Sequence, residues 1–290
     1  MTVKLVINSK SRLGESPSWD AEKELLYWVD IQGKKIHRYD PMKHENHTVE
    51  LDQSPGTIVP REEGEVVLAL ENGFYFYNWI SEHLDPIDDP EEHLPNNRFN
   101  DGKCDPAGRF WAGTTDEDGI EPNGALYCLD TYLNVEEKVS GVRTSNGLAW
   151  SNDFSSMYFI DTPTQQVVRY SYNIETGEIT DPEVILSFNK EEGIPDGMTI
   201  DEEGMLWIAH WGGAKVSRWD PMNGEKIEEI HVPAVNVTSC VFGGKHRDEL
   251  FITTARVGTS NEDLEKYPHA GGLFKVKTKV KGSLSYPFKG

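Results

Sequence analysis

The sequence has little positive charge for its size. Its 28 Lys and Arg residues stand against 49 Asp and Glu residues, which gives a net charge of −21. A surface this acidic repels the phosphates of nucleic acids and anionic membranes, so we expect neither as a partner. The acidity itself is most simply a contribution to solubility.

Long apolar runs and paired cysteines are also missing. No window approaches the ~18 apolar residues of a membrane-spanning helix, and the first residues lack the charged leader and apolar core of a signal peptide. Cys104, Cys128 and Cys240 have no metal-binding spacing and fit reduced, buried thiols. These absences predict a soluble, cytoplasmic protein.

Several patterns of hydrolytic enzymes are absent. There is no Gly-x-Ser-x-Gly motif, which would mark the nucleophile of an α/β-hydrolase. There is no His-x-x-x-His or Cys-x-x-Cys pattern for zinc, and the nine histidines are dispersed. Any hydrolysis by this chain would therefore use water directly, without a covalent serine or cysteine intermediate.

What the sequence does contain is a repeated unit, a turn followed by an apolar run with strand character. Near-regular spacing in the forties, with strands throughout, is typical of propeller blades. Two β-sandwiches would also give short strands, but not the same unit six times. We predict an all-β six-bladed propeller, with four-stranded antiparallel blades around a central channel, as a single domain over residues 1–290. The runs end, at intervals of 39 to 48 residues, at Trp28, Val67, Trp111, Phe159, Trp207 and Phe251.

One copy of the unit shows the pattern clearly. It runs from Ile194 to Ala209, with a strand at 198–200, a turn at Asp201–Gly204 and a second strand after it. Asp196 stands just ahead of the first strand. A ring of blades must close, and Val3–Ile7 is expected to complete the last blade from the other end of the chain and cover its edge.

Five polar residues share two neighbouring positions in this repeat. Counting back 13 or 11 residues from the end of a unit reaches Glu15, Arg98, Asn100, Asn146 and Asp196. Because the innermost strands of a propeller line its channel, these residues should meet at one mouth. Carboxylates and amide oxygens, with no His or thiolate, suit Ca²⁺, Mg²⁺ or Mn²⁺. Each residue alone also fits an ordinary surface turn, so only their shared register favours a metal site.

Four longer motifs resemble the senescence marker protein/gluconolactonase/luciferin-regenerating enzyme family, which includes regucalcin. The similarity covers essentially the whole chain, and the motifs occur in family order. The family commonly has Gly-Glu-Gly-Pro at the first motif, where this chain has Ser16. The motifs are Gly-Glu-Ser-Pro at 14–17, the run from Asn97 to Thr114, Ser145 to Asn152, and Pro195 to Asp201.

The resemblance implies one divalent metal ion in the channel of a six-bladed propeller. The counterparts of its ligands are Glu15, Asn146 and Asp196. We expect Ca²⁺ first, with Mg²⁺, Mn²⁺ or Zn²⁺ as alternatives, because oxygen ligands accept all four.

The resemblance also implies substrate contacts and an activity. Sugar-contacting residues of the family map onto Arg98 and Asn100, and a further acidic contact falls near Glu117 or Asp118. Family members hydrolyse lactones, mostly of sugars, although some act on other esters or are described chiefly as calcium-binding proteins. The expected partner of this chain is therefore a small sugar lactone.

The expected reaction is opening of the lactone ring by water. The metal would polarise the ring carbonyl and stabilise the developing oxyanion, and Asp196 would take a proton from the water. Arg98 and Asn100 would orient the substrate. Two alternatives are a hydrolase of aryl esters or organophosphates on the same metal, and a non-catalytic calcium-binding propeller.

Overall fold

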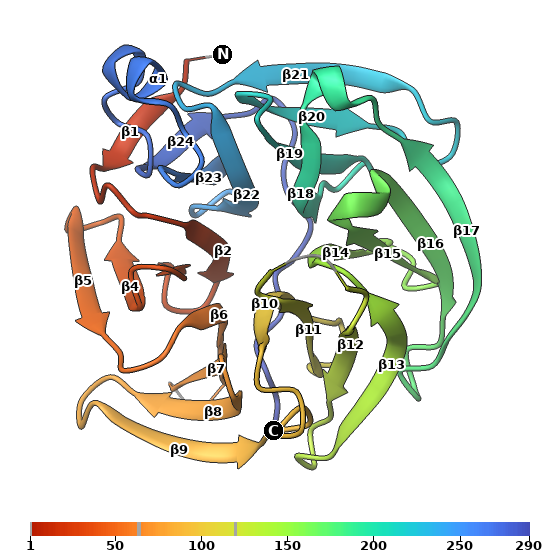
Figure 1. Ribbon diagram of the computed structural model, residues 1–290. Coiled ribbons are helices and arrows are strands. Elements are labelled where there is room, and N and C mark those ends of the chain that lie inside the picture. The colour runs from red at the N-terminus through yellow and green to blue at the C-terminus, as the bar shows by residue number, and fades with distance from the viewer. Residues whose placement is uncertain (1, 63–64, 119–120) are drawn as a thin grey trace.

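The computed structural model describes residues 2–62, 65–118 and 121–290. In these ranges the chain forms six four-stranded antiparallel sheets around a central channel (Figure 1). The predicted six-bladed propeller is confirmed. That all of residues 1–290 form one domain stays a prediction. None of the helices in the described ranges is long and apolar enough to cross a membrane.

The first five blades each use four consecutive strands, with the innermost strand first in the chain. The sixth blade joins three strands from the end of the chain to one from its start. From the innermost strand outward, the blades are β2 (Gly14–Asp20), β3 (Leu25–Asp30), β4 (Lys35–Asp40) and β5 (Glu45–Glu50); β6 (Pro55–Pro60), β7 (Val66–Leu70), β8 (Gly73–Asn78) and β9 (His83–Asp88); β10 (Asn97–Cys104), β11 (Phe110–Asp116), β12 (Gly124–Leu129) and β13 (Val135–Val142); β14 (Ser145–Trp150), β15 (Ser156–Asp161), β16 (Gln166–Tyr172) and β17 (Ile179–Ser187); β18 (Ile194–Ile200), β19 (Leu206–Trp211), β20 (Lys215–Trp219) and β21 (Lys226–His231); and β22 (Asn236–Gly243), β23 (Glu249–Ala255), β24 (Leu273–Lys277) and β1 (Lys4–Ile7). Short helices are η1 (Thr162–Thr164), η2 (Lys190–Glu192) and α1 (Asn261–Lys266).

The apolar runs that mark the repeat are the second strands of the blades. These strands are covered on both faces by neighbouring blades, so they read as continuous apolar segments without polar alternation. In β7 every residue is buried, and Trp28, Trp111 and Trp207 are among the largest fully buried side chains. The outermost strands, such as β5, are largely exposed and carry charged residues. Each blade has one such buried second strand, so the interval between apolar runs in the sequence is the length of one blade.

The ring closes as the sequence predicts. Strand β1 pairs antiparallel with β24, with Lys4 opposite Lys275 and Leu5 opposite Phe274. The strand begins at Lys4, one residue later than the predicted segment. This pairing covers the edge of β24, so β1, contributed by the start of the chain, forms the outermost strand of the sixth blade.

Each innermost strand carries a β-bulge or other register irregularity against the second strand of its blade. In β18 the shift falls between Pro195 and Met198, so Asp196 lies inside it. The sequence placed Asp196 ahead of its strand, but β18 begins at Ile194. A bulge leaves residues unpaired and redirects their side chains, which positions polar groups toward the channel. The matching shifts in the other blades lie between Glu15 and Ser18, Pro55 and Thr57, Phe99 and Gly102, Ser145 and Leu148, and Val237 and Ser239.

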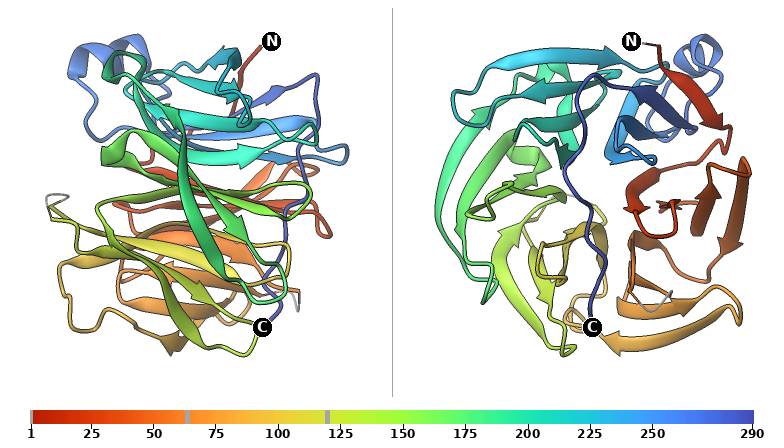
Figure 2. Two further views of the ribbon diagram at one scale, coloured as in Figure 1. Left: turned by 90° about the vertical axis from the view of Figure 1, so that its right-hand side faces the viewer. Right: turned by 180° about the vertical axis from the view of Figure 1, so that it is seen from behind.

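The C-terminal segment crosses the second mouth of the channel, as the view from behind shows (Figure 2). Its backbone bonds to the far ends of the inner strands: Ser283 N–H donates to Ile200 O at 3.1 Å, and Phe288 N–H donates to Pro60 O at 2.8 Å. The Phe288 ring is fully buried in the apolar core between the second and third blades. This segment therefore covers one mouth, a role that the sequence pattern did not indicate.

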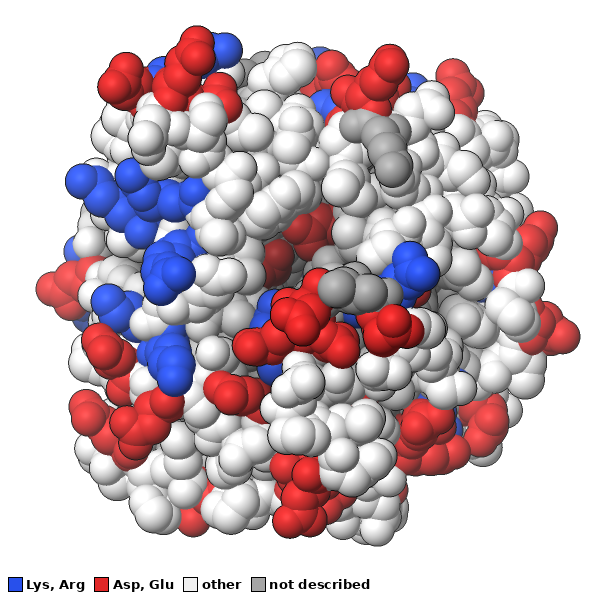
Figure 3. Space-filling model, viewed as in Figure 1, with Lys and Arg blue, Asp and Glu red and all other residues white. Residues whose placement is uncertain are grey.

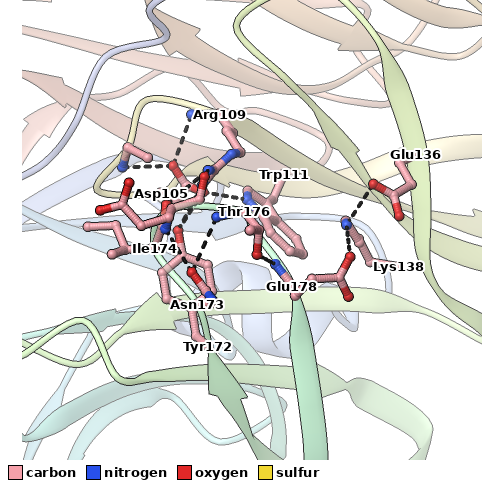
Figure 4. Close-up of polar contacts among 12 residues, drawn as sticks. Asp105, Arg109, Trp111, Glu136, Lys138, Tyr172, Asn173, Ile174, Thr176 and Glu178 are labelled. Carbon is pink, nitrogen blue, oxygen red and sulfur yellow. Dashed lines mark hydrogen bonds and ion pairs between the residues drawn. The ribbon is translucent and has the colours of Figure 1, made fainter.

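A buried carboxylate holds the turn between β10 and β11 (Figure 4). Asp105 is fully buried and accepts hydrogen bonds from the Trp111 indole at 3.0 Å, the Tyr172 hydroxyl at 2.7 Å and the Arg109 guanidinium at 3.0 Å. Tyr172 belongs to the next blade, so Asp105 links two blades. The fifth blade repeats the arrangement, with Asp201 accepting from the Trp207 indole at 2.9 Å.

We expect Asp105→Ala to lower the free energy of unfolding by about 3–5 kcal/mol, because it removes the ion pair of Arg109 and leaves two buried donors, the Trp111 indole and the Tyr172 hydroxyl, without this partner. Asp130→Ala is the matched control. Asp130 also accepts turn N–H groups, at 2.8 Å from Tyr132 and Asn134, but at a more exposed turn, and its loss should cost roughly 1 kcal/mol. Urea unfolding measures both. Equal losses for the two variants would contradict the network's role.

Candidate active site

The open mouth of the channel is formed by the beginnings of the inner strands. The C-terminal segment bonds to the other ends of these strands, so the two mouths differ. On the open face the molecule is hollowed at its centre, with acidic side chains inside the hollow and at its rim (Figure 3). Acidic side chains therefore line this entrance to the channel.

The predicted ligands Glu15, Asn146 and Asp196 lie near the starts of β2, β14 and β18, each in or beside the bulge of its strand. Their residues are only 3%, 4% and 6% exposed. Burying a carboxylate costs several kcal/mol unless a cation or several donors compensate it. Such donors are few here: Glu15 accepts from the Ser16 N–H at 2.7 Å, and Asp196 from the Gly197 N–H.

The carboxylates of the site repel one another. Burial, with Asp196 and Asp101 nearby, raises the pKa of Glu15 well above its ordinary value. Burial and Asp101 raise the pKa of Asp196 in the same direction. Arg98 lowers the pKa of Glu15, but its effect is smaller than the raising effects of burial and of the two carboxylates. A cation bound between Glu15 and Asp196 would offset both the burial and the repulsion.

A chain of directed hydrogen bonds links the other predicted residues. Arg98 Nη1 donates to Asn100 Oδ1 at 2.8 Å and to Phe99 O at 3.0 Å. Asn100 Nδ2 donates in turn to Asn146 Oδ1 at 3.1 Å and to Ser145 O at 2.8 Å. The structure thus brings Arg98, Asn100 and Asn146 together, from two neighbouring blades, as their shared register predicts.

The two acidic residues predicted near the substrate differ in position. The exposed Glu117 carboxylate lies 3.9 Å from Arg98 Nε, so it belongs to the rim of the site. Asp118 is also exposed, and its backbone N–H donates to the Asp116 carboxylate at 2.9 Å. Within the described residues, the Asp118 side chain makes no hydrogen bond or ion pair with the site.

Sequence reasoning missed two charged residues of the channel, Asp101 and Lys103. Asp101 is 5% exposed and accepts from the Ser16 hydroxyl at 3.0 Å and from the Gly102 N–H at 2.8 Å. Lys103 Nζ donates to Met198 O at 2.5 Å, and its charge lowers the pKa of Asp101 against the larger raising effect of burial. Both belong to the run Asn100-Asp-Gly-Lys. Its Asp-Gly pair is typical of a turn, so the sequence did not indicate the bulge that the structure has between Phe99 and Gly102.

The residues present fit a divalent metal ion with oxygen ligands. Within the described residues, no group of three or more His, Cys, Asp or Glu side chains is arranged to hold a metal. The donor set here is instead two buried carboxylates and an amide oxygen, which suits Ca²⁺ or Mg²⁺ and leaves ligand positions for water or substrate. The scarcity of donors to Glu15 and Asp196 is the observation that supports this fit.

Comparison with known proteins identifies the family. The sequence model of the family described as SMP-30/Gluconolactonase/LRE-like region matches residues 13–256. The chain belongs to this family. It is 40% identical over 290 residues to the protein named "Putative sugar lactone lactonase YvrE" of Bacillus subtilis (strain 168), covering 100% of this chain and 99% of that one. It is also 40% identical to the regucalcin of Danio rerio over 99% of this chain and 98% of the relative.

A solved structure of the family has the same fold. It is a calcium-binding protein, regucalcin, from Agrobacterium tumefaciens str. C58. Its TM-score is 0.94 at 25% sequence identity, over 99% of this chain and 97% of the other. The resemblance stated from the sequence motifs is therefore confirmed over the full length of the chain.

Ser16 shows why glycine suits this position in the family. Its backbone φ is +46°, in the left-handed region, where a residue with a Cβ is strained by about 1–2 kcal/mol. Its hydroxyl lies 3.0 Å from Asp101 Oδ1 and 3.1 Å from Gly56 O and shares its one proton between them. The serine thus accepts backbone strain and links the first blade to the second and third.

We expect Ser16→Ala to lower the free energy of unfolding by about 1–3 kcal/mol, because it keeps the strain and removes the hydrogen bond to a buried carboxylate. Ser16→Gly loses the same bond but relieves the strain, so it should be more stable than Ser16→Ala by about 1 kcal/mol. Denaturant unfolding of the three proteins measures the order. A glycine variant less stable than the alanine variant would show that backbone strain at Ser16 is unimportant.

Proposed function

We propose that this protein is a divalent-metal-dependent lactonase that opens the ester ring of a sugar lactone. One observation supports the proposal above others: two buried carboxylates with few donors and an oriented amide lie at one channel mouth beside Arg98. Membership of a gluconolactonase family and 40% identity to a protein named as a sugar lactone lactonase support the substrate class.

Glu15, Asn146 and Asp196 would hold the metal. Calcium is the first choice, because the donors are hard oxygens and a relative of known structure is described as a calcium-binding protein. When bound, such an ion supplies Lewis-acid polarisation of the lactone carbonyl. Mg²⁺, Mn²⁺ and Zn²⁺ are the alternatives in this proposal. We also propose a cytoplasmic location for the protein.

Arg98 and Asn100 would bind the substrate. Arg98 uses Nη1 to contact Asn100 and the backbone, and within the described residues no acceptor pairs with its Nη2. That nitrogen would therefore be available to a sugar hydroxyl or a carboxylate. Glu117, on the rim, would accept from a substrate hydroxyl, and Asp118 is the weaker candidate for this contact because it lacks a link to Arg98.

Asp196 would be the general base. Water adds to the carbonyl carbon while Asp196 takes the proton of that water, and the ring C–O bond then breaks with protonation of the leaving oxygen. One lactone and one water thus give one open-chain hydroxy acid. A bound cation would depress the basicity of a carboxylate, so the role of base would require an Asp196 oxygen that stays at least partly free.

The first test removes the metal. After treatment with a chelator, we expect hydrolysis of gluconolactone, followed by acid release, to fall to its spontaneous rate. Addition of Ca²⁺, Mg²⁺, Mn²⁺ or Zn²⁺ in separate samples should restore it with at least one ion. Unchanged rates in all samples would refute metal-dependent lactonase activity.

The same samples distinguish the two alternatives. Faster turnover of aryl esters or phosphotriesters than of sugar lactones would assign the site to a different hydrolase. Tight binding of Ca²⁺ without turnover of any of these substrates would indicate a calcium-binding propeller.

The second test replaces Asp196 by Asn, which keeps an oxygen donor but removes the base. We expect kcat to fall by about 10²–10⁴-fold, the usual contribution of a positioned general base. Asp220→Asn, at a turn on the outer side of the same blade, is the control and should keep full activity. If Asp196→Asn binds metal and retains near-normal kcat, another group activates the water.

A further inference from the structure

Thr162 joins two inner strands through a single hydroxyl group. It is the first residue of η1, directly after β15, and was not among the residues that the sequence indicated. Its Oγ1 accepts a hydrogen bond from Asn146 Nδ2 at 2.7 Å and donates one to Pro195 O at 2.9 Å. The hydroxyl therefore connects the Asn146 side chain on β14 with the residue before Asp196 on β18.

The direction of both bonds follows from the groups involved. A carbonyl oxygen can only accept, so the single hydroxyl proton of Thr162 goes to Pro195 O. The Thr162 oxygen must then accept from Asn146, which places the NH₂ group of that amide on the Thr162 side. At the opposite end, Asn146 Oδ1 accepts from Asn100 Nδ2 at 3.1 Å. Both ends of the Asn146 amide thus have partners of fixed polarity.

A flipped amide would be penalised at both ends. The Asn146 NH₂ would face the Asn100 NH₂, and the Asn146 oxygen would face a Thr162 oxygen whose proton is already used. Asn100 cannot turn to adapt, because its own oxygen accepts from Arg98 Nη1 at 2.8 Å. In this series of hydrogen bonds Thr162 is the member farthest from Arg98, and it is the partner of the Asn146 NH₂ group.

The backbone of η1 is held without the Thr162 hydroxyl. Thr162 N–H donates to Thr144 O at 3.1 Å, and Gln165 N–H donates to Thr162 O at 3.0 Å. Pro163 follows directly and restricts the turn further. Removing the hydroxyl should therefore free the Asn146 amide without unfolding the turn.

We propose that Thr162 is a positioning residue for the metal site: it orients the Asn146 amide so that oxygen, and not nitrogen, faces the channel-mouth residue Asn100. This inference rests on the proposed function, in which Asn146 is a metal ligand. Groups that orient a metal ligand from behind typically change metal affinity by about 10–100-fold when they are removed. Thr162 is argued to act only through Asn146 and the Pro195 backbone.

The experiment measures binding of Ca²⁺ to the chelator-treated full chain by calorimetry. Thr162→Val keeps the shape but removes the hydroxyl, and should raise the Kd by about 10–100-fold. Thr162→Ser keeps the hydroxyl and should restore the Kd to within about threefold of the original protein. Thr164→Val is the matched control, because Thr164 also donates its hydroxyl within η1, to Asp161 O at 2.7 Å, but does not reach the channel.

A second measurement uses the metal-free protein. The side-chain NH₂ resonances of Asn146 should shift and their protons should exchange faster with solvent in Thr162→Val, but not in Thr164→Val. This signal reports the amide itself and would not change if Thr162 only stabilised the fold. If Thr162→Val does not fold, Thr162→Ala replaces it in both measurements. Slow exchange of the Asn146 NH₂ protons in the unmodified protein is also expected if Thr162 holds this amide, and fast exchange there would contradict the proposal.

The outcomes separate the two proposals. Normal Ca²⁺ binding by Thr162→Val, together with weakened binding by Asn146→Ala, would overturn the role of Thr162 and leave the proposed function standing. Normal binding by Asn146→Ala would overturn the assignment of Asn146 as a ligand, and the role of Thr162 with it. Equal losses in Thr162→Val and Thr164→Val would show a general effect of the turn, which also refutes the proposal.

Discussion

The β-bulge in each innermost strand is the constraint on which the site depends. A regular strand alternates its side chains between two faces and satisfies its backbone through its neighbours, so it presents few groups to a channel running along it. A bulge releases one or two residues from that pairing. In β18 the released segment contains Asp196, and in β14 it contains Asn146. The same irregularity recurs in all six blades, although only some carry polar side chains there.

This arrangement concentrates unfavourable terms at the centre of the molecule. Buried carboxylates raise one another's pKa, and Ser16 has a strained backbone. The stabilising interactions lie farther out, where blades pack through apolar and aromatic side chains and where Asp105 and Asp201 each accept an indole N–H and a guanidinium N–H. The outer shell can therefore hold the channel residues in positions that they would not adopt alone.

Much of the fold could be predicted from the sequence because it depends on a local pattern that repeats. The second strand of every blade is buried on both faces, so its apolar run is visible wherever it occurs, and the interval between runs indicates the blade. The register of these runs also located Glu15, Asn146 and Asp196. It could not distinguish them from Pro17 or Leu148, which occupy equivalent positions, without an argument from metal chemistry.

What the sequence could not predict depends on contacts between distant segments. The Asp101-Gly pair is typical of a turn, yet it lies in a bulge, and only the folded structure shows that Ser16, on the first blade, donates to Asp101 on the third. Thr162 follows β15, where no sequence motif marks it, and its proposed role depends on hydrogen bonds to two different inner strands, β14 and β18. The C-terminal segment lacks regular strands, so no periodicity indicated that Phe288 is buried between the second and third blades.

The geometry of the site also depends on how the ring closes. Glu15 is on the first blade and Asp196 on the fifth, so the sixth blade lies between them, and its inner strand β22 contacts both β2 and β18. That blade is complete only when β1 pairs with β24. Asn146 and Asp196, by contrast, are on adjacent blades and are linked directly through Thr162 and the Pro195 backbone. The first and sixth blades are also joined by a hydroxyl group, because Thr238 Oγ1 on β22 donates to Gly14 O, directly before Glu15, at 2.6 Å. Side-chain hydrogen bonds to the inner strands therefore hold both sides of the site, and the Glu15 side depends in addition on a blade that two distant segments of the chain complete.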